Sequence, residues 1–99
     1  MILNGKQKSY LKSLAQTIKP MFQVGKDGFT EVVQTAVMNY LTKNELGKIA
    51  ILDSCPESKD EIALIIESMK VHVVQVIGNN IVVYKRNPKL EAGIRFPQV

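Results

Sequence analysis

Apolar residues three or four positions apart predict three amphipathic helices. The first covers residues 5 to about 18 and is ended by Pro20. The predicted N-cap residues are Asn4, Thr30 and Ser58, with Gln7 and Glu61 completing capping-box patterns in the first and third helices. The apolar stripes comprise Leu11, Leu14, Ala15 and Ile18 in the first helix, Val32, Val33, Ala36, Val37, Tyr40 and Leu41 in the second, and Ile62, Ile65, Ile66 and Met69 in the third.

Short runs of apolar and β-branched residues between and after these helices predict strands. The four predicted strands cover residues 21–24, 46–52, 71–77 and 81–84. The last two are separated by Gly78-Asn79-Asn80, residue types that tolerate the positive φ angles of a tight turn. We therefore expect these two strands to form a hairpin.

The predicted order, α-β-α-β-α-β-β, alternates helices with strands and ends in a hairpin. It predicts an α/β fold, a single compact domain with a mixed four-stranded sheet and helices packed on it. The chain of 99 residues is long enough for one small domain, which we expect over residues 1–86. Residues 87–99 contain two prolines and Gly93, so we expect an extended C-terminal tail. No apolar run approaches the roughly 18 residues of a membrane span, and we expect no membrane partner.

Thirteen Lys and Arg against nine Asp and Glu leave a net charge of +4, which favours polyanionic partners. Residues 1–26 hold five lysines and no acidic residue, residues 53–67 are acidic, and residues 68–99 are basic again. We expect the fold to bring the basic ends together into one positive surface. Helical spacing would place three lysines in one stripe, namely Lys8, Lys12 and Lys19. A solvated helix edge is the alternative interpretation of this stripe.

Catalytic chemistry has little support in the sequence. The lone Cys55 excludes an intramolecular disulfide and fits a reducing cytoplasm, and His72 lies inside a β-branched run, as a packed strand histidine would. The acidic residues that precede and open the third helix show no calcium-loop spacing, and no nucleotide-binding loop is present. We expect no cofactor, no metal and no small-molecule substrate. A reactive Cys55 thiolate at a helix start is the enzymatic alternative.

One segment does have the composition of a binding loop. Gly25-Lys26-Asp27-Gly28 lies between a predicted strand and a predicted helix N-terminus. Glycines there let the backbone approach a sugar-phosphate chain, amide N–H groups and the helix dipole attract phosphate, and Lys26 adds a positive charge. The other interpretation is an ordinary turn that needs glycine for its backbone angles.

Four segments together resemble the YhbY family, the stand-alone bacterial form of the CRM (chloroplast RNA splicing and ribosome maturation) domain. These segments are Leu3–Leu14, Ile18–Thr30, Asn44–Leu52 and Val74–Tyr84. The resemblance implies a compact domain similar to the C-terminal domain of bacterial translation initiation factor three. It also implies binding to structured RNA and association with precursors of the large ribosomal subunit.

The family's glycine-rich loop falls on Gly25, Lys26 and Gly28, and its basic first helix falls on Lys6, Lys8 and Lys12. Two family positions that are often basic are Asn44 and Asn79 here, and Asp27 places a carboxylate inside the loop. These differences remove positive charge, so we expect RNA affinity to depend more on the first helix and on Lys85 and Arg86. The expected RNA-binding residues are Gly25, Lys26, Asp27, Gly28, Lys6, Lys8, Lys12, Lys19, Lys85 and Arg86.

The leading hypothesis is a cytoplasmic, monomeric RNA-binding factor for large-subunit assembly with no catalytic activity. In it, the loop and the first helix grip the RNA backbone, and RNA shape sets most of the preference. Base stacking on Phe29 is not expected, because a helix-entry aromatic residue usually packs as a hydrophobic staple. The alternative is a protein-interaction adaptor that uses the acidic third helix or the apolar tail residues Ile94, Phe96 and Val99.

Overall fold

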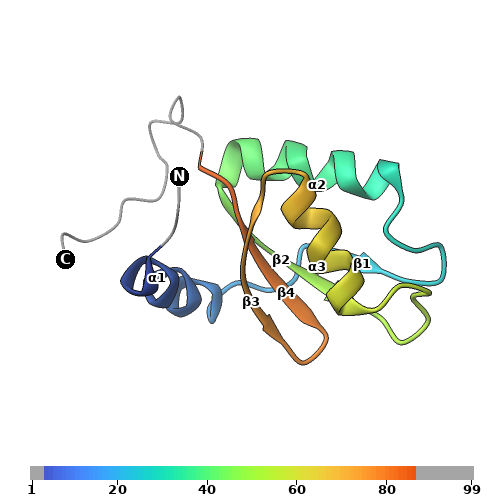
Figure 1. The fold of residues 1–99 in the computed structure, drawn as a ribbon, viewed down its shortest axis with the longest axis horizontal. Coiled ribbons are helices and arrows are strands. Elements are labelled where there is room, and N and C mark those ends of the chain that lie inside the picture. The colour runs from blue at the N-terminus through green and yellow to red at the C-terminus, as the bar shows by residue number, and fades with distance from the viewer. Residues whose placement is uncertain (1–3, 87–99) are drawn as a thin grey trace.

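The computed structural model describes residues 4–86, which form a four-stranded sheet with helices on both faces (Figure 1). The elements in chain order are α1 (Gly5–Ala15), β1 (Phe22–Val24), α2 (Glu31–Asn44), β2 (Leu46–Ile51), α3 (Lys59–Ser68), β3 (His72–Ile77) and β4 (Asn80–Tyr84). This is the predicted order, so the α/β fold class is confirmed. The predicted tail, residues 87–99, lies outside the described residues.

The sheet is mixed, in the strand order β1-β2-β4-β3. β1 and β2 are parallel because the intervening helix α2 returns the chain to the end of the sheet at which β1 began. β4 is antiparallel to both of its neighbours. Parallel pairing places the carboxyl ends of β1 and β2 side by side. The loops that follow these two strands therefore meet at one end of the molecule.

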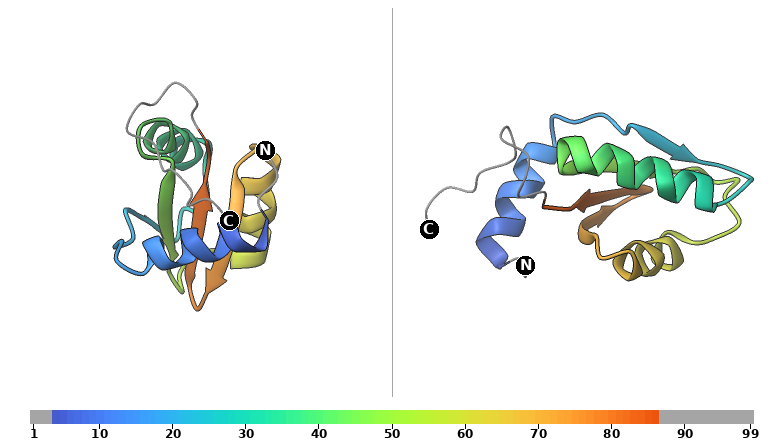
Figure 2. Two further views of the ribbon diagram at one scale, coloured as in Figure 1. Left: turned by 90° about the vertical axis from the view of Figure 1, so that its left-hand side faces the viewer. Right: turned by 90° about the horizontal axis from the view of Figure 1, so that it is seen from above.

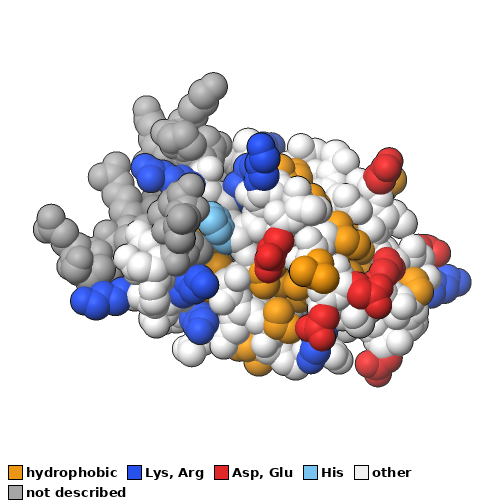
Figure 3. All heavy atoms as spheres, viewed as in Figure 1, with side chains coloured by type: hydrophobic (Ala, Val, Ile, Leu, Met, Phe, Trp, Pro, Cys, Tyr) orange, Lys and Arg blue, Asp and Glu red, His pale blue; other side chains and the backbone are white. Residues whose placement is uncertain are grey.

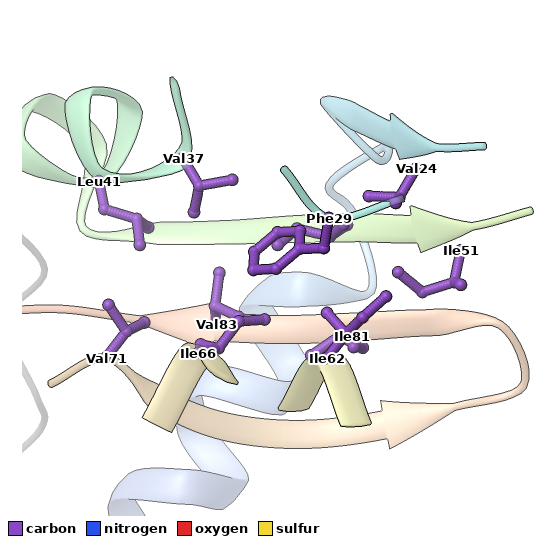
Figure 4. Packing of buried hydrophobic residues seen from close by; sticks show 11 residues of the cluster. Val24, Phe29, Val37, Leu41, Ile51, Ile62, Ile66, Val71, Ile81 and Val83 are labelled. Atoms are coloured by element: carbon purple, nitrogen blue, oxygen red, sulfur yellow. The ribbon is translucent and has the colours of Figure 1, made fainter. Parts of the chain in front are cut away.

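Helices α2 and α3 pack against one face of the sheet and α1 packs against the other (Figure 2). Successive residues of β4 point to opposite faces, so Ile81 and Val83 join the α2/α3 cluster while Val82 and Tyr84 join the α1 cluster. Figure 4 shows side chains from α2, α3 and the sheet meeting in the larger cluster. From the helices it includes Val37, Leu41, Ile62 and Ile66.

The predicted helix caps are confirmed. Asn4 and Gln7 form a reciprocal capping box: the Gln7 backbone N–H donates to Asn4 Oδ1 at 2.8 Å, and the Asn4 N–H donates to Gln7 Oε1 at 3.0 Å. The side chains of Thr30 and Ser58 accept backbone N–H groups at the starts of α2 and α3. Each helix start is thus determined by residues close in sequence.

The prediction for the end of the first helix was wrong by about one turn. α1 ends at Ala15, because the next residues form a turn in which the Thr17 hydroxyl donates to the Leu14 carbonyl. Ile18 still packs against the α1 cluster, but from the connecting segment. Lys19 therefore lies beyond the helix, and the predicted stripe keeps only Lys8 and Lys12 on α1.

Candidate functional site

Gly25-Lys26-Asp27-Gly28, hereafter the GKDG loop, forms a tight turn between β1 and α2. The Gly28 N–H donates to the Gly25 carbonyl at 2.9 Å, and Gly28 has a φ of +79°. That angle strongly favours glycine, so the interpretation of an ordinary turn that needs glycine applies to Gly28. Gly25 has no positive φ, and a Cβ there would make only ordinary contacts, the nearest at 3.5 Å from Ser54 Oγ.

The carboxylate of Glu57 already accepts a backbone N–H group next to this loop. Glu57, from the loop between β2 and α3, accepts the Phe29 N–H with both oxygens, at 3.1 and 3.3 Å. An anion at a helix N-terminus is electrostatically favourable, and here the protein supplies its own. This contact was not predicted because its partners are 28 residues apart in the sequence, although parallel pairing of β1 and β2 brings the two loops together.

The remaining backbone donors of the GKDG loop are fewer than the sequence hypothesis assumed. Gly28 N–H is used within the turn and Phe29 N–H is used by Glu57. Within residues 4–86, the N–H groups of Lys26 and Asp27 donate to no acceptor, and both residues are exposed. These two amides and the Lys26 ammonium are the groups available to an external phosphate.

Phe29 is part of the core and cannot stack on a base. Its side chain is 4 % exposed and lies in the middle of the larger hydrophobic cluster (Figure 4). This placement agrees with the packing interpretation of Phe29. The aromatic ring anchors the start of α2, and with it the GKDG loop, to the sheet.

A recess of about 590 Å³ lies beside the GKDG loop. Its apolar wall comes from β1, the first turn of α2 and the segment after β2. The apolar lining residues are Val24, Val32, Val33 and Leu52. Polar groups at the recess include those of Gln23 and Ser54. The loop is thus one border of a concave surface.

Five of the other predicted basic residues, on α1 and directly after β4, lie at the opposite end of the sheet (Figures 1 and 2). Tyr84, the last residue of β4, packs in the α1 cluster, and this contact brings residues 85 and 86 to the same end as α1. Lys6, Lys8 and Arg86 are exposed, and Lys12 and Lys85 are half-buried. The Lys85 N–H donates to the Glu45 carbonyl at 2.8 Å, which fixes the chain as it leaves the sheet.

Charge is therefore divided along the molecule. Lys and Arg side chains gather over the α1 end, whereas acidic side chains gather over α3 and the loop end (Figure 3). The acidic residues at or next to the starts of α2 and α3 and in the adjoining loops are Asp27, Glu31, Asp53, Glu57, Asp60 and Glu61. The Lys59 ammonium group is held there by the Gly78 carbonyl at 2.9 Å.

The expected single positive surface is only partly present. The N-terminal helix and residues 85–86 do come together, but the GKDG loop lies at the far end and Lys19 lies in the segment between α1 and β1. The reason is topological, because the chain crosses the length of the sheet between α1 and the end of β1. The sequence-predicted residues thus form two groups at opposite ends of the sheet, and Lys19 belongs to neither.

Tyr84 lies at the base of the α1 end and is 1 % exposed. Burial raises the pKa of its hydroxyl above the usual 10.0, Glu45 raises it further, and Arg86 lowers it. The ring stacks on that of His72 with centroids 6.2 Å apart. His72 is therefore a packed strand residue, as its position in a β-branched run predicts.

Residues 4–86 contain no group of three or more His, Cys, Asp or Glu side chains that could hold a metal ion. Cys55 is half-buried and packs against the larger cluster. No helix of these residues is both long and apolar enough to cross a membrane.

Comparison with known proteins identifies the family. Residues 3–85 match the CRS1 / YhbY (CRM) domain. The chain is 38 % identical over 87 residues to the probable RNA-binding protein YqeI of Bacillus subtilis, covering 87 % of this chain and 91 % of that protein. It is 36 % identical over 97 residues to a Haemophilus influenzae protein named RNA-binding protein, covering 97 % and 96 %.

The fold agrees with a solved structure. The solution structure of the hypothetical protein SAV1595 from Staphylococcus aureus superposes with a TM-score of 0.77 at 38 % identity, covering 97 % of this chain and all of that one. The resemblance drawn from the four sequence segments is thereby confirmed. The chain belongs to the CRS1 / YhbY (CRM) domain family.

Proposed function

We propose that this protein binds RNA and associates with precursors of the large ribosomal subunit, without catalysing a reaction. Its similarity to proteins named RNA-binding supports the RNA partner. The resemblance to the YhbY family supports the ribosomal precursor. The observation that carries the proposal is the basic end, where α1 and residues 85–86 present lysine and arginine side chains over one region.

The basic end acts as the main phosphate-binding surface in this proposal. Exposed cations that neutralise phosphates release counterions from RNA, which drives binding with little dependence on base sequence. Lys6, Lys8 and Arg86 are exposed and free to adjust to an irregular backbone. A shape-dependent preference for structured RNA follows, as is common for proteins that contact phosphates and sugars.

The GKDG loop provides a second, weaker phosphate contact. Lys26 and the N–H groups of Lys26 and Asp27 face solvent, but the carboxylates of Asp27 and Glu57 reduce the local positive potential. The two contacts lie at opposite ends of the sheet, so a folded RNA must span the domain to use both. The protein acts as a cytoplasmic monomer in this proposal.

The first test is RNA binding by the purified protein, measured with large-subunit ribosomal RNA fragments over a range of salt concentrations. Neutralising about three to five phosphates predicts a log–log salt slope of roughly −2 to −4. A slope near zero at measurable affinity would contradict backbone recognition. A monomer at the same concentrations, by sedimentation, is expected.

The second test places the protein on ribosomal particles. In cell lysates separated on sucrose gradients, the wild-type protein should sediment with large-subunit precursors, and a Lys8→Ala, Arg86→Ala variant should shift to the top of the gradient. Both side chains are exposed, so the variant should remain folded. Sedimentation of both proteins at the top would contradict the ribosomal part of the proposal and leave RNA binding to the first test.

An interaction adaptor is the second candidate, favoured by the outward stripe of α3. Leu64 is 68 % exposed there, between the exposed acidic residues Glu61 and Glu67. An adaptor would hold a basic protein partner through this stripe, and a Leu64→Ser variant would lose that partner while keeping its affinity for RNA. The apolar tail residues of the same hypothesis lie outside the described residues.

A further inference from the structure

We propose that the recess beside the GKDG loop binds a nucleobase of an unpaired RNA segment. This inference rests on the proposed RNA-binding function and makes it more specific. The recess would read a base while Lys26 and the adjacent amides hold the phosphate next to it. The protein would then distinguish single-stranded from paired RNA at this end of the molecule.

The wall of the recess carries two apolar side chains that the fold itself does not need there. Val32 is 79 % exposed in the first turn of α2, and Leu52 is 41 % exposed directly after β2. Single exposed apolar residues are common, but these two line one recess together with the more buried Val24 and Val33. Covering such a surface with a flat apolar ring would remove it from water.

Backbone pairing fixes the relative position of two segments that line the recess. The Leu52 N–H donates to the Val24 carbonyl at 2.9 Å, which continues the parallel pairing to the rim. Gly25 adds no side chain, and a Cβ there would lie 3.6 Å from Leu52 Cδ1. The volume of about 590 Å³ falls within the range of about 300–1,000 Å³ typical of ligand sites.

Polar groups lie at the border of the recess and in its lining. At one border, the N–H groups of Lys26 and Asp27 have no acceptor within residues 4–86 and can donate to a phosphate, with the Lys26 ammonium as counter-charge. Within the recess, Gln23 and Ser54 offer donors and acceptors to the edge of a base. An apolar wall between such groups matches a nucleobase, which has apolar faces and polar edges.

The local charge decides between nucleotide and other occupants. Asp27 and Glu31 make this end unsuited to a dense array of phosphates, so contact with the neutral base has to supply much of the affinity. A basic peptide would also suit the acidic surroundings, but Lys26 and the two open amides favour a ligand with a negative group. Paired bases in a duplex hide their faces and edges, so the occupant is unpaired.

The experiment compares a 12-nucleotide unstructured RNA with a duplex of the same sequence at one salt concentration. The variant Val32→Ser, Leu52→Ser removes the apolar wall without changing charge. Leu64→Ser is the matched control, because Leu64 is equally apolar and 68 % exposed but lies on α3, outside the recess lining.

We expect the double variant to bind the single-stranded RNA about tenfold more weakly, the size of effect that loss of one base contact produces. Its duplex affinity, its salt slope and its melting temperature should stay close to those of the wild type, and the Leu64→Ser control should bind both RNAs normally. Weakening confined to the single strand is the signature of base recognition.

Wild-type affinity of the double variant for the single strand would overturn the inference and leave the proposed function intact, provided the salt slope persists. Equal weakening for both RNAs would also overturn it, because removing a site that contacts only unpaired bases should not weaken duplex binding. Binding of a Lys-rich, Leu-containing peptide that depends on Val32 and Leu52, without single-strand binding, would assign the recess to a protein instead. No RNA binding by the wild type would refute the proposed function itself.

Discussion

Gly28 is the residue of the GKDG loop whose backbone leaves least choice of side chain. Its φ of +79° lies in the left-handed region, and an added Cβ would meet the Glu57 carboxylate, with Oε2 at 2.9 Å. Both features explain the glycine by the fold of the loop and not by ligand binding. Replacing Gly28 by valine would therefore disturb the loop before it blocked any ligand, and loss of RNA binding in that variant alone could not locate a site.

Gly28→Ala is expected to lower the free energy of unfolding by about 1–2 kcal/mol or more, because an L-residue pays that amount in the left-handed region before any clash is counted. Gly25→Ala should leave stability nearly unchanged, since Gly25 has no positive φ and its added Cβ would make only ordinary contacts. Urea unfolding of the two variants is the measurement. Equal stability of both would show that Glu57 and the loop rearrange freely.

Glu57 is a second residue whose role is visible only in the folded protein. Glu57→Ala should destabilise by about 1–2 kcal/mol, because the Phe29 N–H loses its acceptor next to the core. Glu57→Gln keeps one acceptor oxygen and should cost less. Thermal unfolding at neutral pH compares the two, and a Gln variant as unstable as the Ala variant would contradict the hydrogen-bonding role.

The raised pKa of Tyr84 predicts how the stability of the protein falls at alkaline pH. Burial and Glu45 raise the pKa of its hydroxyl in the folded state above the unfolded value of 10.0, so the folded protein holds this proton more tightly. The contribution is full below pH 10 and is lost as pH rises through the raised value. Tyr84→Phe should show a shallower loss of stability above pH 10 than the wild type in denaturant titrations. Parallel curves would refute the assignment.

At the scale of elements, α1 differs from the other two helices, because among the helices of residues 4–86 it is the one that packs on this face of the sheet. It is an 11-residue helix, and isolated helices of that length are marginal in water. Its packing through Leu11 and Ala15 and its capping box therefore hold three of the proposed RNA-binding lysines in place.

Asn4→Ala removes the N-cap of α1 and should cost about 1 kcal/mol of stability. Gly5→Ala at the first helical residue should have the opposite sign, a gain of about 0.4–1 kcal/mol, because alanine reduces the conformational entropy of the unfolded chain and its Cβ meets nothing within 4 Å among the described residues. Neither change alters a charge. Circular dichroism melts should separate the two variants, and melting temperatures in the reverse order would contradict the capping argument.

At the scale of the whole molecule, the fold places a basic end and an acidic end along the sheet (Figure 3). This arrangement separates Lys12, on α1, from Lys26, in the GKDG loop. Mutations at distant sites without shared partners contribute additively to binding. Substituting the two lysines singly and together therefore tests whether one RNA molecule contacts both ends of the domain.

Lys12→Ala and Lys26→Ala should each weaken binding to structured RNA and reduce the salt slope by about 0.7–0.9, and the double variant should show the sum. Lys12 is half-buried, so its variant also needs a melting curve as a control for packing. If only one of the two substitutions has an effect, the RNA touches one end of the protein and the spanning arrangement is wrong.

The local features of the fold could be predicted from the sequence. The caps at Asn4, Thr30 and Ser58 and the hairpin turn around Gly78 were all predicted, because each depends on residues within a few positions of one another. The end of α1 was missed because apolar spacing continues through Ile18, which packs on the same cluster without being helical.

The sequence by itself determined the order of helices and strands, the residue types of the GKDG loop and the family, because these depend on local patterns and on motifs in fixed order. Only the tertiary structure decided that Glu57 occupies the Phe29 N–H, that Val32 and Leu52 share a recess, and that the loop and α1 lie at opposite ends. Those relations join residues far apart in the chain. They exist because parallel pairing brings the loops after β1 and β2 together while α1 packs near the other end of the same sheet.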